Sequence, residues 1–270
     1  MRSRRMKRLA FVAVALAAVG LASLGAAPGA EIEAEQTDFR RILDQRREIQ
    51  KDAKPGPSEF YFTRGVYSSW RRYSWAVDYP KADVQFLAAV NTLIDVDASD
   101  EENAVRLDDP GLRRFPFLYI LEIADMALTP PEVVGLRNYL LAGGFLVVDD
   151  FWGSYAYANF ERQMRQVLPG HQIVDVPMEH PIFNAVYRID EILQVPAFGN
   201  WWGGVTTECR GCDVFARGIF DEKERLMVFI NGNTDLGDAW EWFERPEYPL
   251  QYSSFAVQMG INFIVYSMSH

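Results

Sequence analysis

The sequence predicts an α/β fold, in which a mostly parallel sheet carries helices on both faces. Residues 117–121 and 145–148 are continuous apolar runs, the composition of strands that are buried on both sides. A helical pattern separates them, as in a crossover connection between parallel strands. The 270 residues are 49% hydrophobic and 24% charged, which fits one globular domain with an N-terminal extension.

The first thirty residues have the order of a secretory signal peptide. Five basic side chains precede Leu9, residues 9–25 are apolar or small, and small residues continue to Ala30. The alternative is an uncleaved anchor, in which residues 9–25 are the only contact with the membrane. Both interpretations place residues 31–270 outside the cytoplasm, periplasmic or extracytoplasmic.

Residues 31–57 predict a charged helical spacer. Apolar positions between Thr37 and Lys51 follow helical spacing, and Pro55 and Pro57 end the pattern. We therefore expect a single α/β domain over residues 58–270.

The first half of this domain predicts a strand at 59–62, an amphipathic helix at 83–94, a short strand at 105–107 and the buried strand at 117–121. The clearest helix start is Thr129, because Pro130 follows at the first helical position and Glu132 completes a capping box. Gly143 and Gly144 end this helix.

The second half begins with the buried strand at 145–148. A helix at 155–168 and a strand at 171–176 follow. The segments 214–220 and 225–230 alternate or run apolar and predict a pair of strands, and residues 255–266 predict a closing helix.

The charge excludes nucleic acid as a partner. The chain has 37 acidic and 27 basic residues, and five of the basic ones lie before Leu9, so the remainder carries a net charge of about −15. The excess acid serves solvation in the simplest interpretation; a cation, a basic partner surface and a polar neutral ligand are the alternatives.

The only cysteines are Cys209 and Cys212. In an exported chain such a close pair predicts a small-loop disulfide, and free thiols or a redox or metal role are the alternatives.

Candidate site residues follow the predicted strands, because ligands of open parallel sheets bind beyond the carboxyl ends of the strands. Asp149 and Asp150 could divide into a neutral acid and an ionised base, or bind a divalent cation. Alternatively, one caps the next helix and the other pairs with Arg64. His180, or else His171, would supply a general base, although a hydrogen-bonded loop histidine is the simpler interpretation.

The stretch from Asn231 to Trp242 resembles the start of a calcium loop. It departs from that pattern because Leu236 replaces the required Gly and Trp242 stands at the twelfth position. Asn233, Asp235 and Asp238 are therefore only weak metal candidates, and a hydrogen-bonded turn is the alternative.

Tryptophans in predicted loops offer a further binding feature. Trp201, Trp202, Trp240 and Trp242, and also Trp70 and Trp75, could form flat apolar platforms for sugars or partner chains, or be buried under the loops.

Several short motifs together resemble the bacterial family known as domain of unknown function 4159. They are Phe62-Thr63-Arg64-Gly65, Asp78-Tyr79-Pro80, Gly143-Gly144-Phe145, Asp149-Asp150-Phe151, His180-Pro181-Ile182-Phe183, and Asn233-Thr234-Asp235 through Trp240-Glu241. The resemblance covers roughly residues 58–270. It implies a flavodoxin-like domain similar to class I glutamine amidotransferases, in exported or tethered proteins often encoded near MoxR-type ATPases and von Willebrand A proteins, and it implies no established activity.

Amidotransferase chemistry needs a cysteine on the turn after a central strand. Here that turn is Asp149 to Gly153, which offers no thiol or hydroxyl, and Cys209 comes some sixty residues later. The sequence also lacks G-x-S-x-G, H-E-x-x-H and a phosphate-binding glycine-rich loop.

We therefore expect an exported, non-catalytic binding domain of the bacterial cell envelope, whose ligand is an envelope protein, a glycan or a small molecule. It needs no cofactor, although a divalent cation is open. The expected binding residues are Arg64, Asp78, Tyr79, Asp149, Asp150, Phe151, Trp152, His180, Asn233 and Asp235. The alternatives are a hydrolase, possibly metal-assisted, that uses Asp149, Asp150 and His180, and a structural component of a membrane-associated complex.

Overall fold

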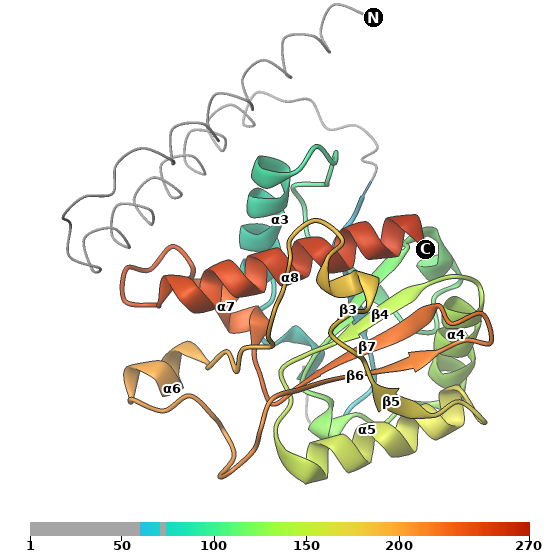
Figure 1. Cartoon of the computed structure of the whole chain (residues 1–270). Helices are drawn as coiled ribbons and strands as arrows, with labels where there is room; N and C mark the ends of the chain where they lie inside the picture. Colours follow the sequence, from blue (N-terminus) through green and yellow to red (C-terminus); the bar gives the residue numbers. More distant parts are fainter. Residues whose placement is uncertain (1–59, 71–73) are drawn as a thin grey trace, which may run out of the picture. The chain divides into compact units, whose positions relative to one another are not determined.

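Seven strands form one sheet in the computed structural model, which describes residues 60–70 and 74–270. The strands are β1 (Thr63–Val66), β2 (Asn103–Arg106), β3 (Phe117–Ile120), β4 (Phe145–Val148), β5 (Ile173–Asp175), β6 (Phe215–Phe220) and β7 (Leu226–Gly232). Their order across the sheet is β2-β1-β3-β4-β7-β6-β5 (Figure 1). The first five in this order are parallel, and β6 and β5 continue the sheet antiparallel. The parallel part has the strand order of a flavodoxin-like sheet, so the predicted fold class is confirmed.

Helices cover both faces of this sheet (Figure 1). They are α3 (Lys81–Leu93), α4 (Pro130–Leu141), α5 (Gly153–Val167), α6 (Phe198–Trp202), α7 (Leu236–Trp242) and α8 (Leu250–Ser269). The helices α4 and α5 lie on one face, and α3, α7 and α8 lie together on the other. In the described part of the chain, no helix has the length and apolar character needed to cross a membrane.

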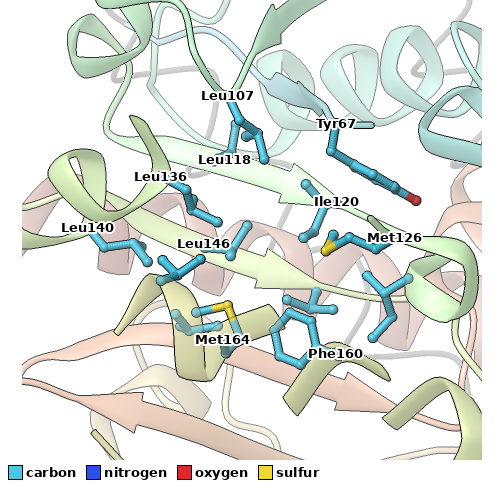
Figure 2. Packing of buried hydrophobic residues seen from close by; sticks show 14 of the residues in the cluster. Tyr67, Leu107, Leu118, Ile120, Met126, Leu136, Leu140, Leu146, Phe160 and Met164 are labelled. Carbon is cyan, nitrogen blue, oxygen red and sulfur yellow. The ribbon is translucent and has the colours of Figure 1, made fainter. Parts of the chain in front are cut away.

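Alternating side chains of the central strands build a separate core on each face. Leu118 and Ile120 of β3 pack with Leu146 of β4 toward α4 and α5, where Leu136 and Phe160 close the cluster (Figure 2). All five side chains are at most 1% exposed. This burial on both faces is the reason why β3 and β4 are recognisable as unbroken apolar runs.

The opposite face is aromatic. Phe62 and Tyr119 contact Trp240 of α7, and the Trp240 ring stacks on Phe86 of α3 at a centroid distance of 4.4 Å. Aromatic contacts of this kind fix α3 and α7 against the sheet. They therefore also fix the loops at the ends of these helices, where the candidate site lies.

Most predicted elements are confirmed with small shifts. The strand at 145–148 has the predicted bounds, and Thr129 and Glu132 form the predicted capping box at the start of α4. The closing helix is longer than predicted, and β6 and β7 pair antiparallel as expected. The predicted signal or anchor at 1–30 and the spacer at 31–57 lie outside the described residues.

The first strand is the main correction. It was expected at 59–62 but lies at Thr63–Val66, and Phe60 forms only an isolated bridge with Ala98. The aromatic run that suggested a strand is instead buried in the core under α3, as Phe62 against Phe86 shows. Thr63, Arg64 and Gly65 are therefore within a strand and not in the loop after it. The short helices α6 and α7 were not predicted.

Candidate functional site: an acidic cluster at the carboxyl edge

Five carboxylates meet beyond the carboxyl ends of β4 and β7, and we call Asp78, Asp150, Asp235, Asp238 and Glu241 the acidic cluster. One carboxylate oxygen from each of Asp78, Asp150 and Asp235 lies within 4.8 Å of the other two. The same holds for Asp78, Asp238 and Glu241, so Asp78 belongs to both groups. The residues come from three separate segments, which the parallel sheet brings to one edge.

Asp149 is next to this cluster but has a structural role. Its Oδ2 accepts hydrogen bonds from Tyr119 Oη at 2.7 Å and from the backbone N–H groups of Leu236 and Gly237 at 2.8 and 3.2 Å. Its Oδ1 accepts from Asn231 Nδ2 at 2.7 Å. Asp149 thus connects β3, β4 and β7 to the first turn of α7, and all four donors are satisfied by this one carboxylate.

Asp150 occupies the turn between β4 and α5 in a left-handed conformation, with φ of 41°. Its side chain is 5% exposed, and Oδ1 accepts a hydrogen bond from Trp152 Nε1 at 3.1 Å. The turn is therefore similar to the sharp strand-to-helix turn that nucleophiles occupy in α/β-hydrolases, here with a carboxylate in that place. Phe151, in contrast, is buried against Phe215 and faces the core, which corrects its assignment as a binding residue.

The first turn of α7 supplies the next acids. Asp235 is 3% exposed and caps the helix, because its Oδ1 accepts from the backbone N–H of Asp238 at 2.8 Å. Both oxygens of Asp238 accept hydrogen bonds, Oδ1 from Trp242 Nε1 at 3.0 Å and Oδ2 from the Phe198 N–H at 2.6 Å. Glu241 lies one helical turn further on and is half-buried.

Asp78 approaches the cluster from the segment before α3, in a left-handed conformation with φ of 59°. The residue as a whole is half-buried, but its Oδ2 atom is fully buried and has no hydrogen-bond partner among the residues that the structure describes. A Cβ atom on Gly237 would come within 2.8 Å of this oxygen. The absence of a side chain at position 237 is thus what lets Asp78 reach the first turn of α7.

Arg64 does not pair with Asp149 or Asp150, which corrects the expected salt bridge. It is fully buried within β1 and forms a two-pronged ion pair with Asp83 of α3. Its Nη1 also donates to the carbonyl oxygen of Val77 at 2.8 Å, and its guanidinium group lies over the Tyr79 ring. Arg64 therefore holds the segment that carries Asp78, and Tyr79 takes part in this support.

The electrostatics of the cluster oppose its ionisation. Burial raises the pKa of Asp150 well above its ordinary value, and the charges of Glu122 and Asp78 raise it further. Burial also raises the pKa of Asp235, with Asp150 as the largest charge contribution. For Asp78, burial and then Asp238 raise the pKa, whereas Arg64 lowers it. Burial raises the pKa of Asp149 to about 6, against the hydrogen bonds from Tyr119 and Asn231.

The histidines lie elsewhere. The His180 ring packs on Phe220 and Tyr266, and Tyr266 Oη accepts a hydrogen bond from Leu226, the first residue of β7. The acidic cluster follows the other end of β7, and a seven-residue strand spans about 20 Å. His171 is at the same distant edge, because it precedes β5 and contacts Glu222 at 3.7 Å. The predicted combination of Asp149, Asp150 and His180 is therefore not brought together.

The stretch from Asn231 to Trp242, which begins at the end of β7, does not form a calcium loop. Asn231 binds Asp149, and Asn233 uses its side chain to accept from the Gly153 N–H at 2.8 Å and to donate to the Asp213 carbonyl at 2.7 Å. The hydrogen-bonded turn is the observed outcome. Of the three weak metal candidates, Asp235 and Asp238 belong to the acidic cluster and Asn233 does not.

Cys209 and Cys212 form a disulfide, as their spacing predicts. The disulfide loop lies beside the start of α5, since a Cβ atom on Gly153 would be 3.7 Å from the Cys209 Cβ. The neighbouring Glu208 is close enough for its charge to raise the pKa of Asp150. The loop therefore adds a further acid to the surroundings of the cluster.

The tryptophans have divided roles. Trp240 is buried in the aromatic core, whereas Trp70 and Trp202 are 80% and 69% exposed. Trp242 stacks on Phe198, and the ammonium group of Lys81 lies over the Trp242 ring. Trp152, which was expected as a binding residue, contacts the cluster directly through Asp150.

The sequence did not reveal Glu241 or the Asp83 partner of Arg64 as parts of this region. A helical interpretation of the stretch after Asp235 would have found Glu241, because residues 238 and 241 are three apart and share one face of a helix. The contact with Asp78 left no signal, since it joins segments far apart in the chain.

The fold and the site together define a flavodoxin-like α/β domain that gathers buried carboxylates at the carboxyl edge of its sheet. The model of one protein family, described as Domain of unknown function (DUF4159), matches residues 64–268. The chain belongs to this family, in agreement with the resemblance of its sequence motifs. A comparison with curated proteins gives no match.

Proposed function

We propose that this chain is an exported, non-catalytic binding domain whose acidic cluster takes up a positively charged group. The observation that carries the proposal is the convergence of Asp78, Asp150 and Asp235 without a basic partner in the described part of the chain. Within residues 60–70 and 74–270, no lysine or arginine forms an ion pair with these three side chains. Two basic side chains of the described segments around the cluster are already engaged, Arg64 by Asp83 and Lys81 by Glu244 at 3.2 Å.

A bound cation resolves the main energetic problem of this site. Buried carboxylates lose their hydration, and close like charges repel one another, so each remains ionised only at a cost of several kcal/mol. A positively charged group placed among the three oxygens replaces both the lost hydration and the repulsion. The site is therefore built to be completed by a cation from outside the described chain.

The composition of the edge favours binding over catalysis. Asp149 already accepts four hydrogen bonds, so it cannot act as the second carboxylate of an acid and base pair without losing them. The sharp turn carries Asp150 in place of a thiol or hydroxyl, and none of the chain's three histidines lies at this edge. The hydrolase alternative required His180 beside these acids.

Exposed aromatic rings on neighbouring segments support a ligand with apolar faces attached to the cationic group. Trp70 follows β1, Tyr155 is in the first turn of α5, and Trp202 ends α6, whose first N–H group binds Asp238. Aromatic rings of this kind stack on the flat faces of sugars. A glycan of the cell envelope is the partner that this arrangement suits.

The proposal that the chain is exported rests on the N-terminal sequence and on the disulfide. The basic and apolar order of residues 1–30 is that of a signal peptide or anchor, and disulfides persist in oxidising compartments. The role as a structural component of a membrane-associated complex depends on residues 1–57, outside the described part, and stays a prediction.

Thermal unfolding of the full chain tests the proposal. The protein is treated with EDTA, dialysed, and screened against Mg²⁺, Ca²⁺, Mn²⁺, spermidine, ethanolamine and arginine, with NaCl controls of matched ionic strength. A cation that binds only the folded chain raises Tm by mass action. We expect at least one cation to raise Tm beyond its NaCl control.

The matched variants are Asp150→Asn in the cluster and Asp95→Asn, which removes an exposed carboxylate after the distant end of α3. The shift should disappear in Asp150→Asn and persist in Asp95→Asn. Equal shifts in both variants, or no shift with any cation, would rule out the cluster as the binding element.

A further inference from the structure

We infer that Asp78, Asp150 and Asp235 bind a hard divalent cation of the Mg²⁺ and Ca²⁺ class, each through one carboxylate oxygen. This inference rests on the proposed function, because it names the chemical class of the positively charged group. It makes a narrower claim than that function, since an organic amine would satisfy the proposed function and contradict this inference.

The buried Oδ2 atom of Asp78 points to a ligand. A carboxylate oxygen without contact with water and without a donor is rare in folded proteins, because nothing then replaces the hydrogen bonds that it made to water in the unfolded chain. This oxygen lies against the first turn of α7, at the point where a Cβ on Gly237 would displace it. A cation at this point supplies the missing partner.

The spacing of the oxygens fits one ion. Ligands on opposite sides of a Ca²⁺ ion are separated by at most about 5 Å, and those of Mg²⁺ by about 4 Å, since the ion to oxygen distances are about 2.4 and 2.1 Å. The three oxygens of Asp78, Asp150 and Asp235 all lie within 4.8 Å of one another. They can therefore contact one ion without a change in the backbone, and water would complete the coordination shell.

Free oxygens favour this group over the second one. Asp150 and Asp235 each use Oδ1 to accept a hydrogen bond, so each keeps its other oxygen for the ion. Asp238 uses both oxygens to accept hydrogen bonds, and Lys81, whose ammonium group lies over the Trp242 ring, contributes positive charge near Asp238 and Glu241. The Asp238 and Glu241 side is thus already partly neutralised, and the unmet demand for positive charge is greatest between Asp78, Asp150 and Asp235.

The donor set selects the class of metal. It contains only carboxylate oxygens, and the two cysteines of the chain, Cys209 and Cys212, are joined in a disulfide and offer no thiolate. All three histidines of the chain lie toward the opposite edge of the sheet. Oxygen ligands without imidazole or thiolate are typical of Mg²⁺, Ca²⁺ and Mn²⁺ sites and not of structural zinc sites.

Terbium luminescence measures the site directly in the full chain. Tb³⁺ replaces Ca²⁺ at oxygen sites and emits when a nearby indole transfers energy to it. The Trp152 indole is suitable because its Nε1 donates a hydrogen bond to Asp150 Oδ1 at 3.1 Å. We expect sensitised Tb³⁺ emission from the EDTA-treated protein, and competition by Ca²⁺ or Mg²⁺ should remove it. The competitor that acts at the lower concentration identifies the preferred ion.

Charge variants test the three ligands. Asp78→Asn, Asp150→Asn and Asp235→Asn should each weaken Tb³⁺ and Ca²⁺ binding at least about tenfold, because each loses an anionic ligand. Asn tolerates the left-handed backbone of positions 78 and 150, so these two variants keep the loop geometry. Asp95→Asn should bind as tightly as the natural chain, and circular dichroism confirms that each variant is folded.

A glycine pair tests the geometry without a change of charge. Gly237→Ala places a methyl group 2.8 Å from the Asp78 Oδ2 and should weaken binding several-fold, although alanine favours the helix. Gly199→Ala in α6 adds the same methyl group where no atom lies within 4 Å, and it should leave affinity unchanged.

The outcomes separate this inference from the proposed function. Cation binding that all three Asn variants weaken, and Asp95→Asn does not, supports the inference. A Tm response to spermidine or arginine without any response to divalent metals overturns it and leaves the proposed function intact. Tb³⁺ emission of equal affinity in the natural chain and in the folded Asn variants also overturns it, because the ion would then bind elsewhere.

Discussion

Asp149 and Asp150 are adjacent in the sequence and have opposite roles. Asp149 accepts four hydrogen bonds and caps the start of α7. The Asp150 side chain, in contrast, belongs to the acidic cluster and uses only Oδ1 to accept a hydrogen bond from Trp152. The sequence identified the pair as site candidates, but it could not assign the roles. The difference arises from the backbone turn at Asp150 and from donors on β3, β7 and α7, which come from distant parts of the chain.

This difference predicts stability effects of opposite sign. Asp149→Asn should lower the free energy of unfolding by about 1–3 kcal/mol, because its new amide group meets donors that need an acceptor. Asp150→Asn should raise the stability of the metal-free chain by about 1 kcal/mol, a Tm increase of about 2–4 °C, since it removes a buried charge repelled by Asp78 and Glu122. Chemical denaturation in EDTA measures both. A loss of stability in both variants would contradict the assignment of Asp150 as a cluster residue.

His180 provides a pH prediction away from the site. Burial, and then the nearby His270, lower its pKa below 6.5, and its Nδ1 accepts from the Ile182 N–H at 3.2 Å. As pH decreases, His180 is therefore protonated in the unfolded chain before it is protonated in the folded chain. The free energy of unfolding falls below about pH 6.5 and levels off below the pKa of His180 in the folded chain.

His180→Asn keeps an acceptor for the Ile182 N–H and has no titrating group. The variant should lose less stability than the natural chain between pH 8 and pH 5, although it is less stable at every pH because ring packing is lost. Denaturation midpoints of both proteins across this range measure the difference. Parallel pH profiles would contradict the role of His180.

Single elements illustrate what the sequence could predict. The capping box of α4 was predicted because its signal is local, and Glu132 also accepts from the backbone N–H and the hydroxyl of Ser68, at 2.9 and 3.0 Å. The helix α7 was missed because Asn231 to Asp235 suggested a loop that continues. In the structure, Asp149, directly after β4, accepts hydrogen bonds from the N–H groups of Leu236 and Gly237 and so caps the start of the helix. A cap supplied from a distant strand leaves no local pattern.

Glu132 should therefore contribute more than an ordinary cap. Glu132→Ala leaves donors at Thr129 and Ser68 without an acceptor and should cost about 2 kcal/mol, a Tm decrease of about 4–8 °C. Glu132→Gln keeps one oxygen and should cost about half as much. Val134→Ala on the exposed side of α4 is the control and should change stability by less than about 0.5 kcal/mol. Equal effects of Glu132→Ala and Val134→Ala would show that the link to Ser68 contributes nothing.

The whole chain, like the acidic cluster, has an excess of acidic over basic side chains. Beyond the first eight residues there are 37 acidic and 22 basic side chains, so self-repulsion destabilises the folded chain at low ionic strength. The parallel sheet was predictable because its buried strands at 117–120 and 145–148 are continuous apolar runs. The composition of the site was predictable only in part, because an acidic excess is usual on soluble surfaces and does not show which carboxylates the fold buries together.

Salt titration should separate the repulsion between exposed charges from the binding of a divalent cation at the acidic cluster. Raising NaCl from about 10 to 200 mM should raise Tm gradually, since it screens the exposed charges over a Debye length of about 10 Å. The response of Asp150→Asn to NaCl should match that of the natural chain, whereas the response to about 1 mM Ca²⁺ or Mg²⁺ should be confined to the natural chain. Scanning calorimetry of both proteins measures the two responses, and a divalent response no larger than that of matched NaCl would mean that only general screening operates.

Anomalous diffraction from crystals of the full chain grown with Mn²⁺ tests the central claim most directly. We expect a manganese peak between Asp78, Asp150 and Asp235, within about 2.0–2.5 Å of one oxygen of each. We also expect the peak to be absent from Asp150→Asn crystals grown under the same conditions. A natural chain without a peak at this position, with the Asp78 Oδ2 bonded to a neighbouring carboxyl group instead, would contradict the account.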